Sequence, residues 1–185
     1  AKIAAMMNVQ NPFLNTFERA ASRAKEQFYH MSGDHLALLN VFKGYEASGF
    51  DLQWCKDNYL NPRNMKQAVS VCKQLVSILD RLGVHDTRKA FDGFKSKHVA
   101  GSTADGADED NDDDPRFANH IRRAILSGYF TRIAMALPTK NQYVTLKDGV
   151  KALLFPSTML NRRPSFVVYN ELVLTSNHYV RTVTS

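Results

Sequence analysis

The hydrophobic pattern of this chain changes its period near the middle, and this change restricts the possible folds more than any other feature. Before residue 100, apolar residues recur every three or four positions, as they do on one face of a helix. After the acidic run, one more helix is marked by Phe117, Ile121, Ala124, Ile125 and Tyr129 and ends at Ser127-Gly128. From residue 133 onward, short β-branched and aromatic runs alternate with turn residues, which is typical of strands. The sequence therefore predicts an α+β chain in which a small helical bundle precedes a β-barrel.

Local signals place the helices of the bundle. Asn15 and Glu18 have the spacing of an N-cap with a reciprocal bond. The side chain of Asp34 is expected to cap the next helix. A short third helix is expected over residues 52–60, and Pro62 opens a fourth, because the missing N–H of proline costs nothing in the first turn.

Short apolar segments predict the strands, at 133–137, 143–146, 150–155, 166–169 with 171–175, and 179–183. Asp148 and Gly149 lie between the second and third of these, and this dipeptide is a strong hairpin signal. Several short strands joined by tight turns indicate a small barrel rather than a sandwich. An OB-type barrel is the expected architecture.

The net charge of +6 hides a division of the chain. Seven acidic residues and no basic ones lie between Gly101 and Pro115, so this segment is predicted to be a disordered acidic linker. An alternative is that it acts as an internal decoy, competing with a ligand for basic surfaces. The remaining residues contain 24 Lys and Arg against 11 acids, a balance that favours a polyanionic partner.

Several classes of site are not expected. Cys55 and Cys72 fall in helical patterns and are predicted to be buried thiols, since a disulfide framework or zinc site would need more cysteines or a metal-like spacing. His30 and His35 are five apart, which does not place both on one helix face, so no metal site is predicted. No apolar run reaches the roughly 18 residues of a membrane span.

Two long segments and three short ones resemble the C-terminal region of DEAH-box RNA helicases; they are 28–42, 169–184, 54–61, 121–130 and 154–158. In the family's run Gly-Asp-His-Leu-Thr-Leu-Leu-Asn-Val, Ala37 replaces Thr. Within the family, the chain is most similar to the subgroup that acts in spliceosome disassembly and ribosome biogenesis.

The resemblance implies an order of domains. Residues 1–14 would end a winged-helix region, 15–100 would form a ratchet-like bundle, 101–115 the linker, and 116–185 an OB fold that is incomplete at its C-terminal end. The absence of an initiator Met suits a segment of a longer chain. The parent would contain RecA-like domains, use ATP and magnesium, and be nuclear (nucleoplasm and nucleolus) or also cytoplasmic.

This chain itself carries no Gly-x-x-x-x-Gly-Lys-Ser/Thr loop and no Asp-Glu-Ala-His run. Phosphoryl transfer needs a phosphate cradle and a positioned metal, so we expect no cofactor in this segment and no ATP hydrolysis by it alone. The first hypothesis is an accessory module that helps to form a single-stranded RNA channel. A second is a protein-docking platform for a G-patch cofactor, and a third is an independent OB-fold binding protein.

No catalytic residue is predicted. The RNA-binding candidates are Arg63, Asn64, Arg122, Arg162, Arg163, Asn177, Tyr179 and Arg181. Arg63 is expected at a helix N-terminus, where free N–H groups attract phosphate, although a plain capped turn is equally open. Arg181 is expected beside an aromatic face, and Arg162–Arg163 could be a solvated basic turn. Asp34 and His35 could suggest an acid–base pair, but helix capping is the preferred interpretation.

Overall fold

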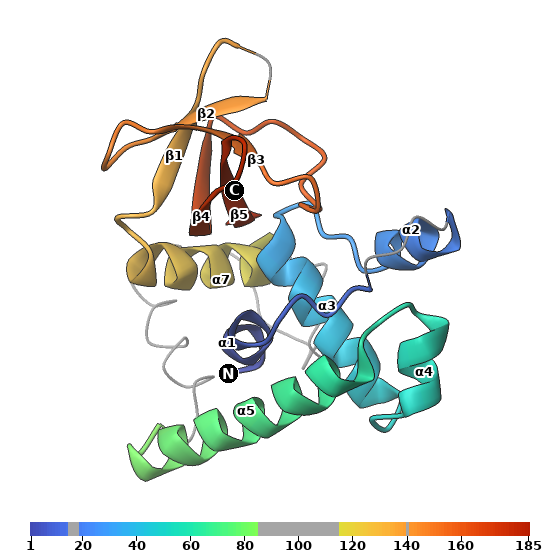
Figure 1. Cartoon of the computed structure of the whole chain (residues 1–185). Helices are drawn as coiled ribbons and strands as arrows, with labels where there is room; N and C mark the ends of the chain where they lie inside the picture. The colour runs from blue at the N-terminus through green and yellow to red at the C-terminus, as the bar shows by residue number, and fades with distance from the viewer. Residues whose placement is uncertain (15–18, 85–114, 140) are drawn as a thin grey trace, which may run out of the picture.

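The computed structural model of the chain describes residues 1–14, 19–84, 115–139 and 141–185. A helical bundle lies beneath a β-barrel, and one helix runs along the base of the barrel (Figure 1). The predicted cap formed by Asn15 and Glu18 lies outside the described residues, as does the acidic run before Pro115. Both remain predictions.

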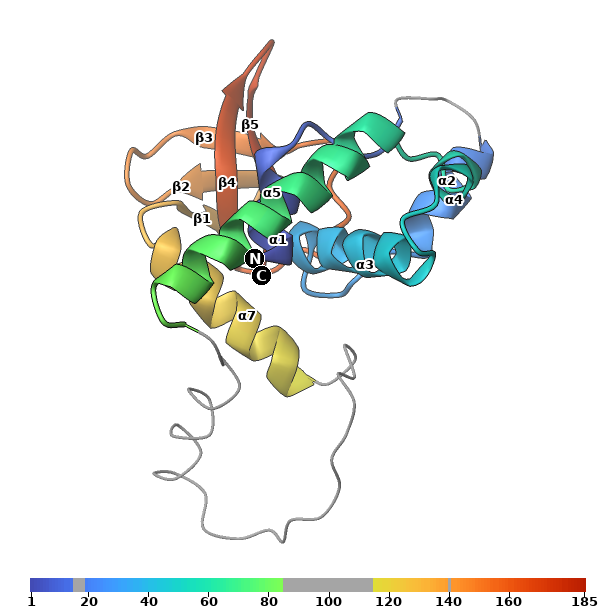
Figure 2. The same cartoon turned by 90° about the horizontal axis from the view of Figure 1, so that it is seen from below.

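The bundle contains α1 (Lys2–Asn8), α2 (Arg19–Glu26), α3 (Asp34–Ala47), α4 (Leu52–Asp57) and α5 (Pro62–Arg81). Helix α1 lies between α3 and α5 and contacts both (Figures 1 and 2). Residues 1–14, assigned from the sequence to the end of a winged-helix region, therefore pack into the bundle, where Ala5 and Met6 are fully buried. No helix in the described parts of the chain is long and apolar enough to cross a membrane.

The expected apolar faces of the helices form one core. Its buried members come from α1, α3, α4, α5 and the segments between them: Ala5, Met6, Phe28, Val41, Phe42, Tyr45, Cys55, Leu60, Met65, Ala68 and Cys72. Trp54 packs on this core edge-to-face with Phe28, at 5.9 Å between ring centroids. Both cysteines are buried free thiols, as predicted, and burial raises the pKa of Cys55 to about 11.

Local capping explains where two helices begin. The Asp51 carboxylate accepts hydrogen bonds from the backbone N–H groups of Gln53 and Trp54 and so caps α4. Helix α5 begins at Pro62, as predicted, and the side chain of Asn61 caps it.

The barrel consists of β1 (Ile133–Ala136), β2 (Gln142–Thr145), β3 (Lys151–Leu154), β4 (Phe166–Leu174) and β5 (His178–Thr184). The strands close in the order β1-β2-β3-β5-β4, and only β3 and β5 are parallel. The predicted OB-type barrel is thus confirmed. Among the described strands, β4 pairs with β1 and closes the sheet. The expectation that the OB region is incomplete at its C-terminal end stays a prediction.

The predicted hairpin turn joins β2 to β3. Gly149 has a φ of 66°, which an Asp-Gly turn requires. Across the turn, the backbone N–H of Thr145 donates to the carbonyl of Val150, and the backbone N–H of Val150 donates to the hydroxyl of Thr145. The barrel core contains Ala134, Tyr143, Ala152, Leu160, Val167, Tyr169, Val180 and Val183. Helix α7 (Pro115–Gly128) runs along the base of the barrel, between it and the bundle (Figure 1).

Candidate nucleic-acid interface

The first turn of α3 joins the bundle to the barrel. The Asp34 carboxylate accepts three hydrogen bonds from barrel residues: from the backbone N–H of Met159 at 2.6 Å, the backbone N–H of Val183 at 2.8 Å and the hydroxyl of Thr158 at 2.9 Å. The N-cap position of α3 is Gly33, and no side chain caps it. The prediction that Asp34 caps this helix is therefore wrong. Its carboxylate oxygens instead accept hydrogen bonds from the barrel, across the boundary between the bundle and the barrel.

Burial has opposite effects on the two titratable groups of this turn. It raises the pKa of Asp34, although the three donors and nearby Lys25 oppose the shift. It lowers the pKa of His35 to about 4, so this ring is neutral at pH 7. His35 Nδ1 is hydrogen bonded to the Thr184 hydroxyl at 2.7 Å, while its Nε2 atom is buried without a partner among the described residues. The two side chains serve as a joint, not an acid–base pair.

Backbone contacts tighten the same joint. Gly33 pairs with Thr184 as an isolated antiparallel bridge, and Ser185 donates its backbone N–H to the carbonyl of Ser32. Gly33 has a φ of 107°, and a Cβ placed on it would lie 2.4 Å from the carbonyl oxygen of Val183. Only glycine allows so close an approach in this conformation.

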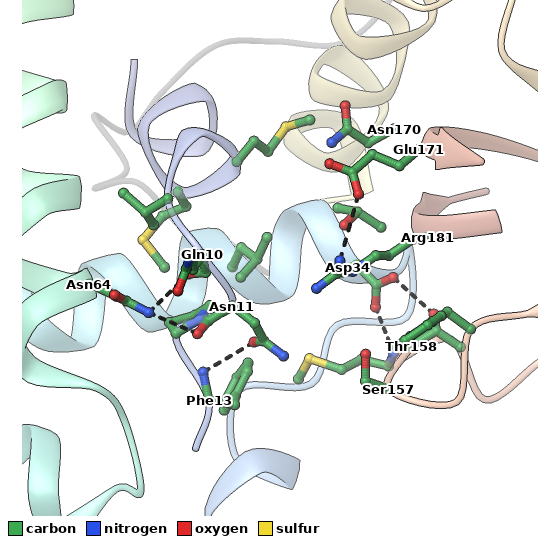
Figure 3. Close-up of a pocket in the computed structure, with 18 of the residues that line it drawn as sticks. Gln10, Asn11, Phe13, Asp34, Asn64, Ser157, Thr158, Asn170, Glu171 and Arg181 are labelled. Atoms are coloured by element: carbon green, nitrogen blue, oxygen red, sulfur yellow. Dashed lines mark hydrogen bonds and ion pairs between the residues drawn. The ribbon is translucent and has the colours of Figure 1, made fainter. Parts of the chain in front are cut away.

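A cleft of about 760 Å³ opens beside the joint, between the bundle and the barrel. We call it the interdomain cleft. The bundle side is lined by the chain that follows α1 and by the start of α5, and the barrel side by β4, β5 and the 155–159 loop (Figure 3). Its polar and charged lining residues include Asn8, Gln10, Asn11, Lys25, Asp34, Asn61, Asn64, Ser157, Thr158, Asn170, Glu171, Arg181 and Thr182. Arg181 of the barrel and Asn64 of the bundle, both RNA-binding candidates from the sequence, line this cleft.

Arg181 has the aromatic neighbour expected for it. Its guanidinium lies 5.2 Å from the ring centre of Phe155, which in turn packs edge-to-face with Tyr179 at 5.7 Å. Glu171 lies on the other side, with 3.7 Å between its Oε2 and Arg181 Nη1. A cation, an aromatic surface and a carboxylate therefore stand together on the barrel wall of the cleft. Such a group suits a nucleotide, because phosphate binds cations and bases stack on aromatic rings.

The start of α5 lies on the opposite wall and is already capped. The Asn61 side chain accepts the backbone N–H groups of Arg63 and Asn64, so these two donors are not free for phosphate. The Asn64 side chain is buried and donates to the carbonyls of Gln10 and Asn11, which ties the chain after α1 to α5. Arg63 itself is exposed, one residue from the cleft wall.

The other candidate arginines lie away from the interdomain cleft and contact the protein's own backbone. Arg122 donates to the carbonyl of Ser185 at 2.6 Å, and Arg162 to its hydroxyl at 3.3 Å. Arg163 donates to the carbonyls of Leu137 and Thr139. These bonds fix the end of β5 and the β1–β2 connection. The structure does not bring these three residues together with Arg181.

Asn177 and Tyr179 belong to the β4–β5 hairpin. The Asn177 carbonyl accepts the backbone N–H of Thr175, which closes the turn, and the Asn177 residue is exposed. Tyr179 is half-buried against Phe155 and so supports the aromatic surface under Arg181. Of the eight candidates, Arg181, Tyr179, Asn64 and Arg63 thus lie at or near the cleft.

Sequence reasoning missed the other cleft residues. Lys25 donates to the carbonyl of Ser157 at 2.6 Å and lies 5.3 Å from the Phe13 ring centre, and burial lowers its pKa. Glu171 lies within the 169–184 segment that carries the family resemblance, but nothing in its spacing connects it to Arg181. That link requires the strand register, which pairs Glu171 directly with Arg181.

A second, mainly apolar groove of about 630 Å³ lies between α7 and the barrel. Its floor includes Leu126, Leu146 and Phe166, which remain 41%, 53% and 53% exposed. Arg122 and Arg123 lie at its edge. Within the described ranges, no group of three His, Cys, Asp or Glu residues could hold a metal ion.

The comparison with known families concerns the part of the chain that forms the barrel wall of the cleft. Residues 121–185 match the family model of the oligonucleotide/oligosaccharide-binding (OB) fold. The match covers most of α7 and all five strands, and it agrees with the closed barrel. It includes Arg181, Tyr179, Phe155 and Glu171, so the barrel wall of the cleft is similar to a domain type named for oligonucleotide or oligosaccharide binding.

Proposed function

We propose that this chain is an accessory nucleic-acid-binding module of a DEAH-box RNA helicase, and that single-stranded RNA lies in the interdomain cleft. The observation that carries the proposal is the placement of Arg181 over Phe155 on the wall of an OB barrel, facing the start of α5. A cation beside an aromatic ring can hold phosphate and base together without reading the sequence. A translocating motor requires such tolerance of sequence.

The parent protein would supply the ATPase. RecA-like domains in the same parent chain would use ATP and magnesium, and the module would couple their movement to the RNA strand. We further propose that the parent acts in pre-mRNA splicing or ribosome biogenesis, in the nucleus. The resemblance of segments 28–42 and 169–184 to this helicase group supports these assignments.

The test is a salt titration of RNA binding by the 185-residue chain. Arg63→Ala and Arg181→Ala should each weaken binding of a labelled oligouridine, and should reduce the slope of log affinity against log salt by about 0.7 for each phosphate that the arginine neutralises. The free energy of unfolding should change by less than about 1 kcal/mol, because Arg63 is exposed, Arg181 is partly exposed, and solvent-accessible cations contribute little to stability. Oligoadenosine should give the same result if the contacts are to phosphate.

Arg81→Ala is the matched control, because Arg81 is exposed at the far end of the same helix α5. It should leave the salt slope unchanged. If Arg181→Ala also keeps the affinity and slope of the unaltered chain, the cleft is not the RNA site. If only Arg63→Ala has no effect, the capped turn at Asn61 is a structural feature and RNA contacts the barrel wall alone.

The second candidate function is docking of a G-patch type protein, and the apolar groove beside α7 favours it. Three exposed apolar side chains beside two arginines suit a segment that combines apolar and acidic residues. Replacing Phe166 with Ser should then weaken cofactor binding, whereas Leu174→Ser, at a position that is 68% exposed outside the groove, should not. Unchanged binding by Phe166→Ser would exclude the groove as the docking site.

A further inference from the structure

Glu171 and Arg181 form an unusual pair for a phosphate-binding surface. They are directly opposite on β4 and β5, and both line the interdomain cleft (Figure 3). Their closest approach is 3.7 Å, longer than the 2.7–3.2 Å typical of a hydrogen bond. The side chains remain 37% and 51% exposed for Arg181 and Glu171 respectively. Each therefore keeps hydrogen-bonding capacity for a ligand.

The backbone beside this pair is strained. The β4–β5 ladder is interrupted between the pairs Tyr169–Val183 and Glu171–Arg181, and Thr182 has a φ of 52°. A β-branched residue rarely adopts this conformation, and such strain is concentrated at functional sites. Val180 and Val183 are both fully buried although they are three residues apart, which strict alternation along a strand would not allow. The distortion thus presents Arg181 to the cleft while both valines stay in the barrel core.

A carboxylate at this point restricts what the ligand can be. A carboxylate is negatively charged and therefore repels phosphate, and because it only accepts hydrogen bonds, Glu171 needs a donor from the ligand. Arg181 only donates, so it needs an acceptor. The ligand must therefore offer a hydroxyl or N–H donor close to an anion. Ribose in RNA does so, because its 2′-hydroxyl and 3′-phosphate leave adjacent carbons, and DNA lacks this hydroxyl.

We propose that Glu171 accepts a hydrogen bond from a ribose 2′-hydroxyl while Arg181 contacts the adjoining phosphate, so that the interdomain cleft selects RNA over DNA. This inference rests on the proposed function, since it assumes that nucleic acid enters the cleft. It assigns Glu171 as a specificity-determining residue. The competing role is that of a counter-ion that only holds Arg181 in place.

The experiment compares three labelled oligomers of equal length on the 185-residue chain: oligouridine, its deoxy form and its 2′-O-methyl form. The unaltered chain should prefer the ribo form, and the 2′-O-methyl form should bind like the deoxy form, because both lack the donor. Glu171→Ala should weaken binding of the ribo form by about 2- to 10-fold, the range for one hydrogen bond. Binding of the other two oligomers should stay the same or strengthen, because a negative charge is removed.

Glu171→Gln keeps an acceptor oxygen and should retain part of the preference for RNA. Asp148→Asn is the control for the change in charge, since it removes a carboxylate outside the cleft and leaves an Asn-Gly sequence that the hairpin turn accepts. Its preference should match that of the unaltered chain. Equal changes for all three oligomers in Glu171→Ala would reduce Glu171 to a counter-ion and overturn the inference.

A chain that binds all three oligomers equally from the start would also overturn the inference, while leaving the proposed function intact. A different result would contradict the proposed function: an Arg181→Ala variant that binds every oligomer with the affinity of the unaltered chain. The two failures are therefore separable in one set of titrations.

Discussion

Replacing Asp34 with Ala should uncouple the bundle from the barrel. The substitution removes all three hydrogen bonds to Met159, Val183 and Thr158 and leaves two barrel N–H groups without acceptors. Hydrogen bonds to a charged group contribute about 1.5–3 kcal/mol each, and the cost of burying the carboxylate, visible in its raised pKa, offsets part of the sum. We expect a net loss of about 3 kcal/mol. With a urea m-value of about 2 kcal/mol/M, the midpoint falls by about 1.5 M.

The assay uses the only tryptophan of the chain as a reporter for the bundle. Trp54 packs on the bundle core, within 6.1 Å of the Tyr45 ring centre, so its fluorescence follows bundle unfolding. Hydrogen exchange of the β2 and β4 amides follows the barrel. In the unaltered chain the two probes should give one transition, because the joint links the two cores. In Asp34→Ala the transitions should separate.

Asp34→Asn provides the graded control. An amide keeps one acceptor oxygen but turns an N–H group toward one of the barrel donors, so about half of the loss is expected. If Asp34→Ala leaves both transitions unchanged, the three bonds contribute no net stability, and the joint rests on the His35–Thr184 hydrogen bond and the Gly33 and Ser185 backbone contacts. If Asp34→Asn stabilises the chain, the cost of burying the carboxylate exceeds the gain from its bonds.

Three further predictions concern the joint and the acidic run. Because the pKa of His35 is lowered to about 4 in the folded chain, its contribution to stability is present above pH 6.5 and is lost as the pH falls toward 4, by up to about 3 kcal/mol. The raised pKa of Asp34 changes the stability in the opposite direction over acidic pH. The difference in urea midpoint between His35→Gln and the unaltered chain, measured against pH, isolates the effect of His35. Gly33→Ala should lower the free energy of unfolding, measured by urea titration, by about 2 kcal/mol or more. Gly128→Ala should leave it unchanged, because the added Cβ would meet no atom within 4 Å. Deleting residues 102–114 should leave the thermal midpoint nearly unchanged, because the segment has almost no apolar side chains, and a rise in RNA affinity at low salt would support the decoy hypothesis.

Local signals were sufficient for the elements of the fold. The start of α5 at Pro62 and the turn at Gly149 follow from the conformations that single residues prefer. The strand segments follow from short β-branched and aromatic runs separated by turn residues, and the barrel follows from several short strands joined by tight turns.

The candidate site could be predicted only in part, because its geometry depends on long-range pairing. Asp34 has the sequence context of a helix cap. Only the folded chain shows that the backbone N–H of Val183, 149 positions away, donates a hydrogen bond to its carboxylate. From the sequence, Arg122 and Arg162 are expected on a basic surface, yet both donate hydrogen bonds to Ser185. Their roles depend on where the last strand ends in space, which periodicity does not reveal.

The position of Asp34 makes it possible to separate orientation from charge as contributions to RNA binding. Asp34 lines the interdomain cleft, and the Val183 N–H that it accepts lies two residues from Arg181. If only charge mattered, removing this carboxylate in Asp34→Ala would strengthen the binding of polyanionic RNA. If its main effect is to hold β5 against the bundle, Arg181 loses its fixed place in the cleft and affinity falls. We expect affinity to fall under conditions in which both domains remain folded, with Glu26→Gln, an exposed carboxylate outside the cleft lining, as the charge control. Stronger RNA binding by Asp34→Ala would show that the joint does not position the RNA-binding wall.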